Sequence, residues 1–168
     1  REAVADADNR ATFYACAGAF EQNPAVARAA VAAGHEICSH GWRWEEVFRL
    51  TEEEEEREHI RLAIASFEKT CGKRPVGWYC RYGPSTRTRR LLAEEGGFLY
   101  DSDAYNDDVP YFRMVGDERR LVVPYTCDVN DLRYWLSPGL IQADDFFAYM
   151  KESFEVLYAE AARGPRMM

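Results

Sequence analysis

Short apolar runs rich in β-favouring residues alternate along the chain with longer segments of helical periodicity. Such runs, bounded by turn-forming residues, predict buried strands. The predicted strands are RATFYAC (residues 10–16), HEICS (35–39), VGWYC (76–80), FLYDSD (98–103) and LVVPYT (121–126). We predict a long polar loop between the last two of these strands.

The segments between the strands carry the signals of helix starts and stops. Asn23 can cap a helix that has Pro24 at its first position, and Gly34 can supply the left-handed stop. Thr51 and Glu54 have the spacing of a capping box at the start of the next helix. The predicted helices cover residues 24–33, 51–72, 85–95 and 142–164.

The helix predicted at 51–72 has an apolar side and a strongly acidic start. Ile60, Ile64 and Phe67 recur at helical spacing and are expected to face a core. The five glutamates at 52–56 are expected to form a solvated first turn that the helix dipole favours, and not a ligand cluster. His59 is expected on the surface of the same helix.

Strands that alternate with helices are typical of βαβ units, which build a mostly parallel sheet or barrel. With 168 residues, the chain is long enough for one domain with a sizeable core. The sequence contains no internal repeat and no low-complexity linker. We therefore predict an α/β fold in a single domain that covers residues 1–168.

The charge balance excludes some classes of partner. Acidic residues outnumber basic ones 29 to 21, which gives a formal net charge of −8, and the basic residues form no single block. A phosphate backbone needs a basic footprint, so we expect no nucleic-acid partner. No apolar run approaches the roughly 20 residues of a membrane span, and the first residues do not form a signal peptide. We therefore expect no membrane partner.

The chain has five cysteines, an odd number, with no CxxC motif and no regular spacing. This pattern favours free thiols in a reducing compartment over a disulfide framework, and it predicts a cytoplasmic location. The cysteines expected to be free are Cys16, Cys38, Cys71, Cys80 and Cys127.

Polar and aromatic residues gather just after the predicted strands. In parallel α/β folds the binding site lies beyond the carboxyl ends of the strands. The residues that follow these ends are His40, Trp42, Arg43, Trp44, Arg81, Tyr82, Asp101, Asp103, Asp128, Asn130 and Asp131. Strand ends always lead into loops, so chance placement explains part of this pattern. A site for catalysis or for a small ligand explains it better, because four strand ends bring an imidazole, a guanidinium, carboxylates and rings to one rim.

The histidines that flank the second predicted strand have different expected roles. His35 follows a glycine turn, where a hydrogen-bonded structural role is expected, whereas His40 follows the strand's end, where its side chain can face a pocket. No second histidine lies at helical or turn spacing from His40, and a zinc hydrolase needs three protein ligands and an open position. The sequence therefore argues against a histidine-rich metal centre.

Five further stretches are distinctive: GHEICSHGWRW, TEEEEEREHI, RPVGWYCRYGPSTRTRRLLAEEGGFLYDSDAYNDDVPYF, VVPYTCDVNDLRY and FEVLYAEAARGPRMM. They are spread from residue 34 to residue 168, and they resemble the polysaccharide deacetylase superfamily, most closely its cofactor-independent allantoinase branch. The resemblance implies a deformed (β/α) barrel of the polysaccharide deacetylase type. It also implies hydrolysis of the hydantoin ring of allantoin to allantoate, a reaction of purine catabolism, with no cofactor.

Two departures from the superfamily pattern refine these expectations. Metal-dependent members carry a second histidine four residues after the one that matches His40, and this chain has Trp44 there. The allantoinase branch shares that change, so the resemblance implies no metal ligands and a pocket with aromatic walls. In the superfamily a strand with an acidic pair precedes the matched region, and a strand with a Leu-His pair follows it. We therefore expect a partial barrel that lacks its first strand and its C-terminal elements.

The implied reaction needs an activated water, a stabilised oxyanion and a proton for the departing nitrogen. His40 is the first candidate for the acid/base or oxyanion role, because the pKa of an unperturbed imidazole lies nearest neutral pH. Asp103 and Asp131 are candidates for orienting His40 or binding ureido nitrogens. Rings are expected to sandwich the flat substrate and an amide to bond its edge. The residues expected to bind substrate are Trp42, Trp44, Arg81, Tyr82, Tyr125 and Asn130.

Three functional hypotheses remain open from the sequence. The first is a metal-independent amidohydrolase that opens a cyclic ureide at a non-peptide C–N bond. The second is a metal-dependent N-deacetylase of chitin or peptidoglycan, and the third is a catalytically silent binding fragment. For the first hypothesis we expect a small-molecule cyclic ureide as substrate and a homo-oligomeric assembly.

Overall fold

The computed structural model describes residues 9–137, 139 and 141–168. It divides into two compact units. The first unit comprises Arg1–Asp103 and Phe112–Val122, and the second comprises Ala104–Tyr111 and Val123–Met168. The extent of the catalytic domain, expected to be residues 1–168, stays a prediction.

A six-stranded sheet forms the centre of the first unit, in the order β1-β2-β3-β4-β6-β5. Its strands are β1 (Thr12–Ala15), β2 (Glu36–Ser39), β3 (Gly77–Trp78), β4 (Tyr100–Asp101), β5 (Tyr111–Val115) and β6 (Glu118–Val122). Every pairing from β1 to β6 is parallel. Among the described strands, β1 and β5 form the two edges, so this sheet is open and does not close on itself. The predicted α/β class with a mostly parallel sheet is confirmed.

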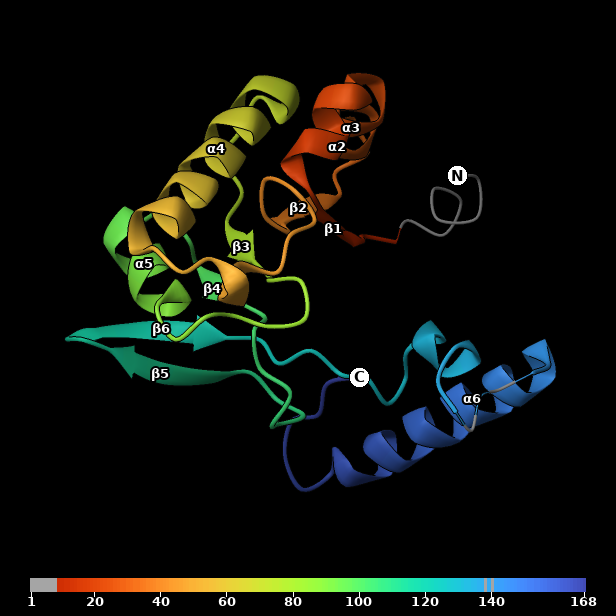
Figure 1. The fold of residues 1–168 in the computed structure, drawn as a ribbon. Helices are drawn as coiled ribbons and strands as arrows, with labels where there is room; N and C mark the ends of the chain where they lie inside the picture. The colour runs from red at the N-terminus through yellow and green to blue at the C-terminus, as the bar shows by residue number, and fades with distance from the viewer. Residues whose placement is uncertain (1–8, 138, 140) are drawn as a thin grey trace. The chain divides into compact units, whose positions relative to one another are not determined.

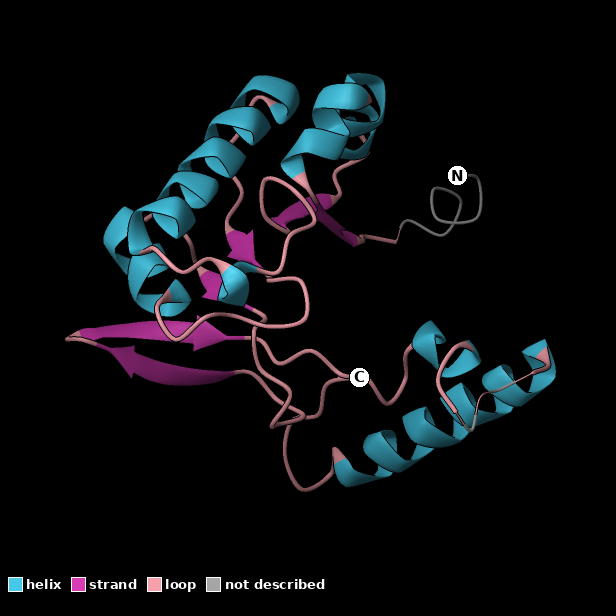
Figure 2. Ribbon diagram, in the orientation of Figure 1, coloured by secondary structure: helices cyan, strands magenta, loops and turns pink. Residues whose placement is uncertain are grey.

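Helices cover one side of this sheet (Figure 1). They are α2 (Ala17–Gln22), α3 (Pro24–Ala32), α4 (Glu53–Cys71) and α5 (Thr88–Glu95), with a short 3-10 helix, η1, at Val47–Arg49. The predicted apolar side of α4 is confirmed, since Ile60, Ile64 and Phe67 are buried in the core beneath these helices. Figure 2 shows how helices and strands alternate through this unit.

Besides the short η1, the sequence does not predict two elements of the first unit, α2 and β5. Helix α2 has only six residues, too few for its sequence to show a clear helical period. Strand β5 lies in the segment predicted as a polar loop, where Gly116 and Asp117 connect it to β6. Gly116 has φ +58°, a backbone conformation that two-residue hairpin turns favour. The residues of β5 are exposed or half-buried, so its apolar pattern is weak.

The acidic start of α4 differs from the prediction in two ways. The residue before its first turn is Glu52, which makes no side-chain capping bond, so the predicted capping box of Thr51 and Glu54 is wrong. Glu56 is only 1% exposed, so the glutamates do not form a uniformly solvated turn. Its carboxylate accepts hydrogen bonds from the hydroxyls of Ser85 and Thr88. These bonds tie α4 to the segment that starts α5.

The second unit contains η2 (Asp131–Tyr134) and the long helix α6 (Ala143–Glu160). Tyr125 lies beside Tyr105 in an edge-to-face contact, and its backbone N–H donates to the Ala104 carbonyl. These contacts join the two segments of the unit. No helix in the described part of the chain is both long enough and apolar enough to cross a membrane.

All five cysteines are free, as predicted. Burial raises the pKa of Cys38 to about 12 and raises that of Cys80 well above its usual value. A thiol with so high a pKa carries almost no thiolate at neutral pH. These two cysteines are therefore packing residues and not nucleophiles.

Candidate active site

The register of the parallel strands lines up their carboxyl ends. Ala15 lies opposite Ser39, Ser39 opposite Trp78, and Trp78 opposite Asp101. The residues that come next in β2 and β3 are His40 and Tyr79. Because the register is so even, they begin the loops at the same level of the sheet, together with the residues that follow β1 and β4.

His40 is held in one orientation by Tyr79. The His40 Nδ1 atom lies 2.7 Å from the Tyr79 carbonyl oxygen, and the two rings stack with centroids 5.1 Å apart and planes at 16°. A carbonyl oxygen can only accept a hydrogen bond, so Nδ1 carries the proton. The Nε2 atom is then unprotonated, and its lone pair can accept a proton. Burial lowers the pKa of His40, the hydrogen bond to the Tyr79 carbonyl opposes this shift, and the positive charge of Arg81 reinforces it. At neutral pH the ring is therefore a neutral base.

Arg81 connects the loop after β3 to the loop after β2. Its guanidinium carbon lies 3.9 Å from the ring centre of Trp44 and 4.7 Å from that of Tyr82. Its Nη1 atom donates to the Trp44 carbonyl oxygen at 2.9 Å. The Arg81 Nε atom is buried and has no hydrogen-bond partner. The Arg81 guanidinium also pairs with the Glu46 carboxylate, with Nη2 4.0 Å from Oε1, so Nε is its one nitrogen without a partner among the described residues.

Tyr82 has an unusual backbone. Its φ is +58°, and it is the one non-glycine residue with a positive φ in the described part of the chain. Holding a residue with a side chain in this region costs of order 1–3 kcal/mol, and such strain clusters at functional sites. The side chain is 67% exposed, so core packing does not explain the conformation. Tyr82 therefore fits a role as one wall of a binding site.

Asp103 follows β4 and is 4% exposed. Its Oδ1 atom accepts a hydrogen bond from the Cys80 backbone N–H at 2.7 Å, while its Oδ2 atom is buried without a hydrogen-bond partner. Burial raises the pKa of Asp103 to about 7, although the bond from Cys80 opposes the shift. A carboxyl group with this pKa can either give or take a proton near neutral pH.

The raised pKa of Asp103 predicts a pH-dependent cost to stability. The folded protein keeps a proton on this carboxyl that the unfolded chain releases near its usual pKa of 3.8. The unfolding free energy therefore falls as the pH rises towards 7, by up to about 1.4 kcal/mol per pH unit. Asp103→Asn keeps the acceptor for Cys80 and cannot ionise, so its stability relative to wild type should rise between pH 5 and pH 7 and then level off.

Chemical denaturation of the two proteins at several pH values measures this difference. Asp131→Asn, which changes an exposed carboxyl group, is the control variant. A stability difference between Asp103→Asn and wild type that stays constant from pH 5 to pH 7 would contradict the prediction.

The two remaining histidines are structural. The prediction for His35 is confirmed, because its Nδ1 atom accepts a hydrogen bond from the Ala11 backbone N–H at 3.3 Å. The surface position predicted for His59 is wrong, since His59 is 4% exposed. Its Nε2 atom accepts a hydrogen bond from the Trp42 backbone N–H at 3.1 Å. No local pattern in the sequence predicts this bond, because it joins residues on different elements.

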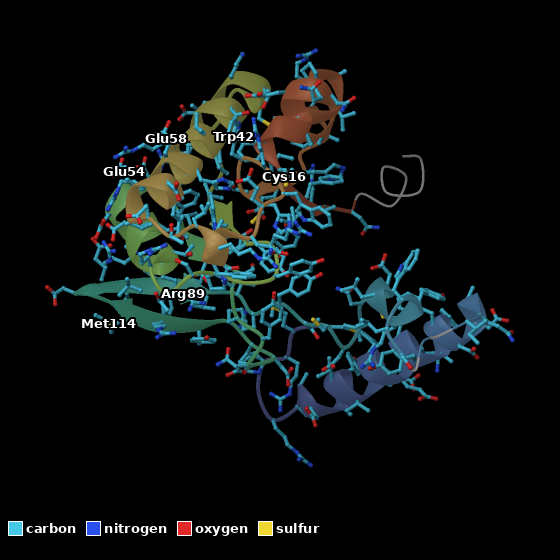
Figure 3. The ribbon with its side chains drawn as sticks, in the orientation of Figure 1. Cys16, Trp42, Glu54, Glu58, Arg89 and Met114 are labelled. Carbon is cyan, nitrogen blue, oxygen red and sulfur yellow. The ribbon has the colours of Figure 1, made fainter. Side chains whose placement is uncertain are left out.

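Trp42 lies beside helices α2 and α4 (Figure 3). Its half-buried ring packs against the core, and the guanidinium carbon of Arg43 lies 4.1 Å from its centre. Trp44, by contrast, is 60% exposed beside Arg81. Of the two tryptophans predicted as substrate walls, Trp44 has the more open ring, and the role of each stays a prediction.

Three predicted site residues belong to the second unit: Tyr125, Asn130 and Asp131. The Asn130 side chain donates to the Tyr125 hydroxyl at 2.6 Å and accepts from the Leu132 backbone N–H at 2.9 Å. Asn130 therefore caps η2, and Asp131 is exposed in the first turn of that helix. Their roles towards a substrate stay predictions.

The donor atoms in the described residues do not fit a metal. A metal centre in a hydrolase takes three protein ligands. No three His, Cys, Asp or Glu side chains in the described part of the chain are grouped in a way that could hold an ion. The residue four positions after His40 is Trp44, and the Arg81 guanidinium packs on its ring. The Arg81 charge acts on His40 as well and opposes a second cation there.

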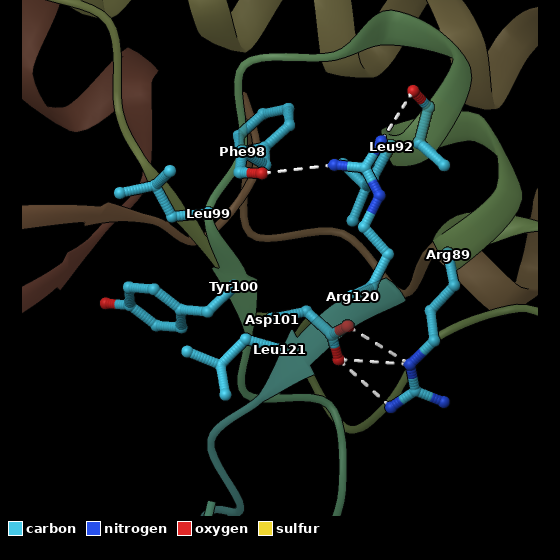
Figure 4. A pocket seen from close by; sticks show the side chains of 9 residues that line it. Arg89, Leu92, Phe98, Leu99, Tyr100, Asp101, Arg120 and Leu121 are labelled. Carbon is cyan, nitrogen blue, oxygen red and sulfur yellow. Dashed lines mark hydrogen bonds and ion pairs between the residues drawn. The ribbon is translucent and has the colours of Figure 1, made fainter. Parts of the chain in front are cut away.

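A small pocket between α5, β4 and β6 is a separate feature (Figure 4). Two arginines line it, and protein groups already bind both of them. Arg89 pairs with Asp101 through its Nε and Nη2 atoms, at 3.0–3.1 Å. Arg120 donates to the carbonyl oxygens of Phe98 and Ala93. These bonds fit a role in joining α5 to the sheet.

Comparisons with known proteins place these features in a family. Residues 2–100 match the family model described as polysaccharide deacetylase. A Schizosaccharomyces pombe protein named "Putative polysaccharide deacetylase" is 36% identical, over 94% of this chain and 54% of its own length. A solved structure of Puue allantoinase is 47% identical, with a TM-score of 0.90, over 99% of this chain and 55% of its own. A solved probable polysaccharide deacetylase from Pseudomonas aeruginosa PAO1 is 46% identical, with the same TM-score and the same two coverages.

The chain therefore spans about half the length of each of these three proteins. Because nearly all of it superimposes on that half in the two solved structures, the predicted partial barrel of this type is confirmed.

Proposed function

We propose, on the premise that this chain belongs to the polysaccharide deacetylase family of hydrolases, that it forms part of an amidohydrolase that opens the hydantoin ring of allantoin to give allantoate. The observation that carries the proposal is the state of His40. Its Nδ1–H is bound by the Tyr79 carbonyl, so its Nε2 lone pair is available as a base that needs no metal. The 47% identity to the Puue allantoinase structure supports this choice of substrate.

The proposed reaction begins with His40. Its Nε2 atom takes a proton from a water molecule as the water oxygen attacks a ring carbonyl carbon. The carbonyl oxygen becomes an oxyanion, and we assign its stabilisation to the positive charge of Arg81, which also acts on His40. The protonated His40 then gives its proton to the ring nitrogen as the C–N bond breaks. The products are a carboxylic acid and a free ureido nitrogen, so atoms and protons balance.

The aromatic side chains have a binding role in this scheme. Trp44 and Tyr82 are both exposed rings that contact Arg81, with centroids 6.5 Å apart, and a flat hydantoin ring can stack on a ring of this kind. Asp103, whose pKa burial raises to about 7, is the second candidate for the general acid or base, after His40. It follows β4, and its Oδ1 atom accepts a hydrogen bond from the Cys80 backbone N–H.

The alternative function is N-deacetylation of a carbohydrate. The matching family model and the name of the Schizosaccharomyces pombe relative favour it. Its chemistry in this family calls for a metal, and the donor set described above does not fit one. A catalytically silent binding role is the third possibility.

A turnover assay with and without a chelator separates these functions. The full-length protein that contains this chain should hydrolyse allantoin equally well before and after treatment with EDTA. N-acetylated chitooligosaccharides, offered as a second substrate, should release no acetate. Acetate release that EDTA abolishes, with no loss of allantoin, would establish the deacetylase instead. Binding of allantoin with no turnover of either compound would establish the silent role.

A further inference from the structure

Helix α4 directs two polar side chains into the protein beneath the candidate site. Glu56 and His59 lie three positions apart, so they share one face of the helix. They are 1% and 4% exposed, respectively. Glu56 binds the segment between β3 and α5, and His59 binds the loop after β2. One helix face thus contacts both loops that carry the proposed catalytic groups.

His59 holds the peptide that joins Gly41 to Trp42. The Trp42 N–H donates to His59 Nε2 at 3.1 Å. On the other side, the carbonyl oxygens of Gly41 and Trp42 accept hydrogen bonds from the Ala17 and Gly18 N–H groups at the start of α2, at 3.0 and 2.8 Å. Two helices therefore clamp this short segment.

Gly41 allows the imidazole to come so close. A Cβ atom at this position would lie 2.5 Å from His59 Nε2, and the backbone has φ +85°, which favours glycine. The clamped segment begins directly after His40 and leads to Trp44. A displacement of the segment would therefore move both His40 and the ring beside Arg81.

We propose that His59 is a positioning residue whose neutral imidazole fixes the Gly41–Trp42 peptide and, through it, the orientation of His40 and Trp44. This inference rests on the proposed function only where it concerns turnover. The hydrogen bond and its effect on the loop do not depend on which substrate the protein takes.

The bond requires one protonation state of His59. Because Nε2 accepts from Trp42, the single proton of the neutral ring must be on Nδ1, which lies 3.7 Å from the Glu45 carboxylate. A second proton on Nε2 would face the Trp42 N–H, so two donors would meet and the bond would be lost. Burial lowers the pKa of His59, Glu45 and Glu56 oppose this shift, and Arg43 reinforces it. His59 therefore stays neutral at pH 7, and the clamp opens only in acid.

Two substitutions in the full-length protein distinguish the positioning role of the His59 hydrogen bond from the space that its side chain fills. His59→Gln keeps an acceptor near the place of Nε2 and cannot gain a proton, whereas His59→Ala removes the acceptor. Glu58→Ala, on the exposed side of the same helix, is the matched control. The readout is hydrogen exchange of the Trp42 backbone amide, followed by NMR, together with kcat and KM for allantoin.

In His59→Ala the Trp42 amide should exchange at least about 10-fold faster, because its acceptor is gone. The kcat for allantoin should fall by about 10-fold or more with little change in KM, because misplaced catalytic groups slow the chemical step. His59→Gln should keep both values within about 2-fold of wild type at pH 7. Its Trp42 amide should also stay protected at an acidic pH where the wild-type amide has become exposed.

Either of two exchange results overturns the proposal: a Trp42 amide that stays protected in His59→Ala, or a His59→Gln variant that loses as much protection as His59→Ala. If the protein does not hydrolyse allantoin, the exchange data alone test the role of His59. A failure of the proposed function is then distinguished from a failure of the proposal for His59. If His59→Ala does not fold, the ¹⁵N shifts of the His59 ring in the unmodified protein decide instead. A ring that carries its proton on Nε2 at pH 7 would overturn the proposal.

Discussion

The His40→Ala variant is expected to hydrolyse allantoin about 10²–10⁴-fold more slowly than the wild-type protein. The substitution removes the Nε2 base and the proton donor that the departing nitrogen needs. The other two imidazoles cannot replace them, because His35 flanks the opposite end of β2 and His59 is buried, with its Nε2 atom bound by the Trp42 N–H. The fold should survive, because His40 is half-buried and its backbone N–H to Ala15 remains. Steady-state kinetics and thermal unfolding of the full-length protein measure the two effects.

The control for this prediction is the histidine that flanks the other end of β2. His35→Ala removes an imidazole at the opposite end of β2, where the ring accepts a hydrogen bond from Ala11. It should cost some stability, about 1–2 kcal/mol, and leave kcat nearly unchanged. Near wild-type turnover by His40→Ala would remove His40 from the mechanism and make the Asp103 carboxyl group the leading candidate.

Glu56→Ala is expected to cause the largest loss of stability, about 3–5 kcal/mol. The Glu56 carboxylate accepts hydrogen bonds from the hydroxyls of Ser85 and Thr88, and it forms an ion pair with Arg87 at 3.3 Å. Without it, buried hydroxyls and a guanidinium lose their acceptor, which costs more than the bonds themselves contribute. Arg87 also donates to the carbonyl oxygens of Leu50 and Thr51, which lie just before α4. Loss of the Glu56 carboxylate would therefore loosen both the start of α4 and the segment before α5. Urea denaturation at pH 7 measures the change.

The neighbouring Glu55 gives a matched control, since it has the same side chain in the same helical turn but is exposed. Glu55→Ala should change the unfolding free energy by less than about 0.5 kcal/mol. Equal losses in Glu55→Ala and Glu56→Ala would show that helix propensity, and not the buried bonds, explains the effect.

These two glutamates also show where prediction from the sequence stops. Within the run at 52–56, nothing local distinguishes the residue that becomes buried, because burial depends on the packing of Ser85 and Thr88 from another part of the chain. His59 was misplaced for the same reason, since its partner Trp42 lies 17 positions away. Patterns of period 2 and 3.6 describe which elements form, and they say little about which polar groups meet between elements.

The candidate site was predictable where a general rule of the fold applied. The sequence predicts His40 and Arg81 at the rim because parallel strands present their carboxyl ends at one edge, and the structure places them in the loops after β2 and β3. Tyr79 was missed, because its contribution to His40 comes from a backbone carbonyl and from ring stacking, which leave no mark in residue type. Asn130 was judged by its chemistry, and the structure adds a capping role that any Asx residue could fill.

The bond from His40 to the Tyr79 carbonyl has a consequence for sequence variation. An orienting group that belongs to the main chain is present whatever residue occupies the position, so mutation at Tyr79 cannot delete it. In many hydrolases the group that orients a histidine is a carboxylate side chain, which a single codon change removes. In this chain the tautomer of the His40 ring is instead set by the path of the main chain just after β3. We infer that evolution can vary the ring at Tyr79, and so tune the walls of the site, without losing the base.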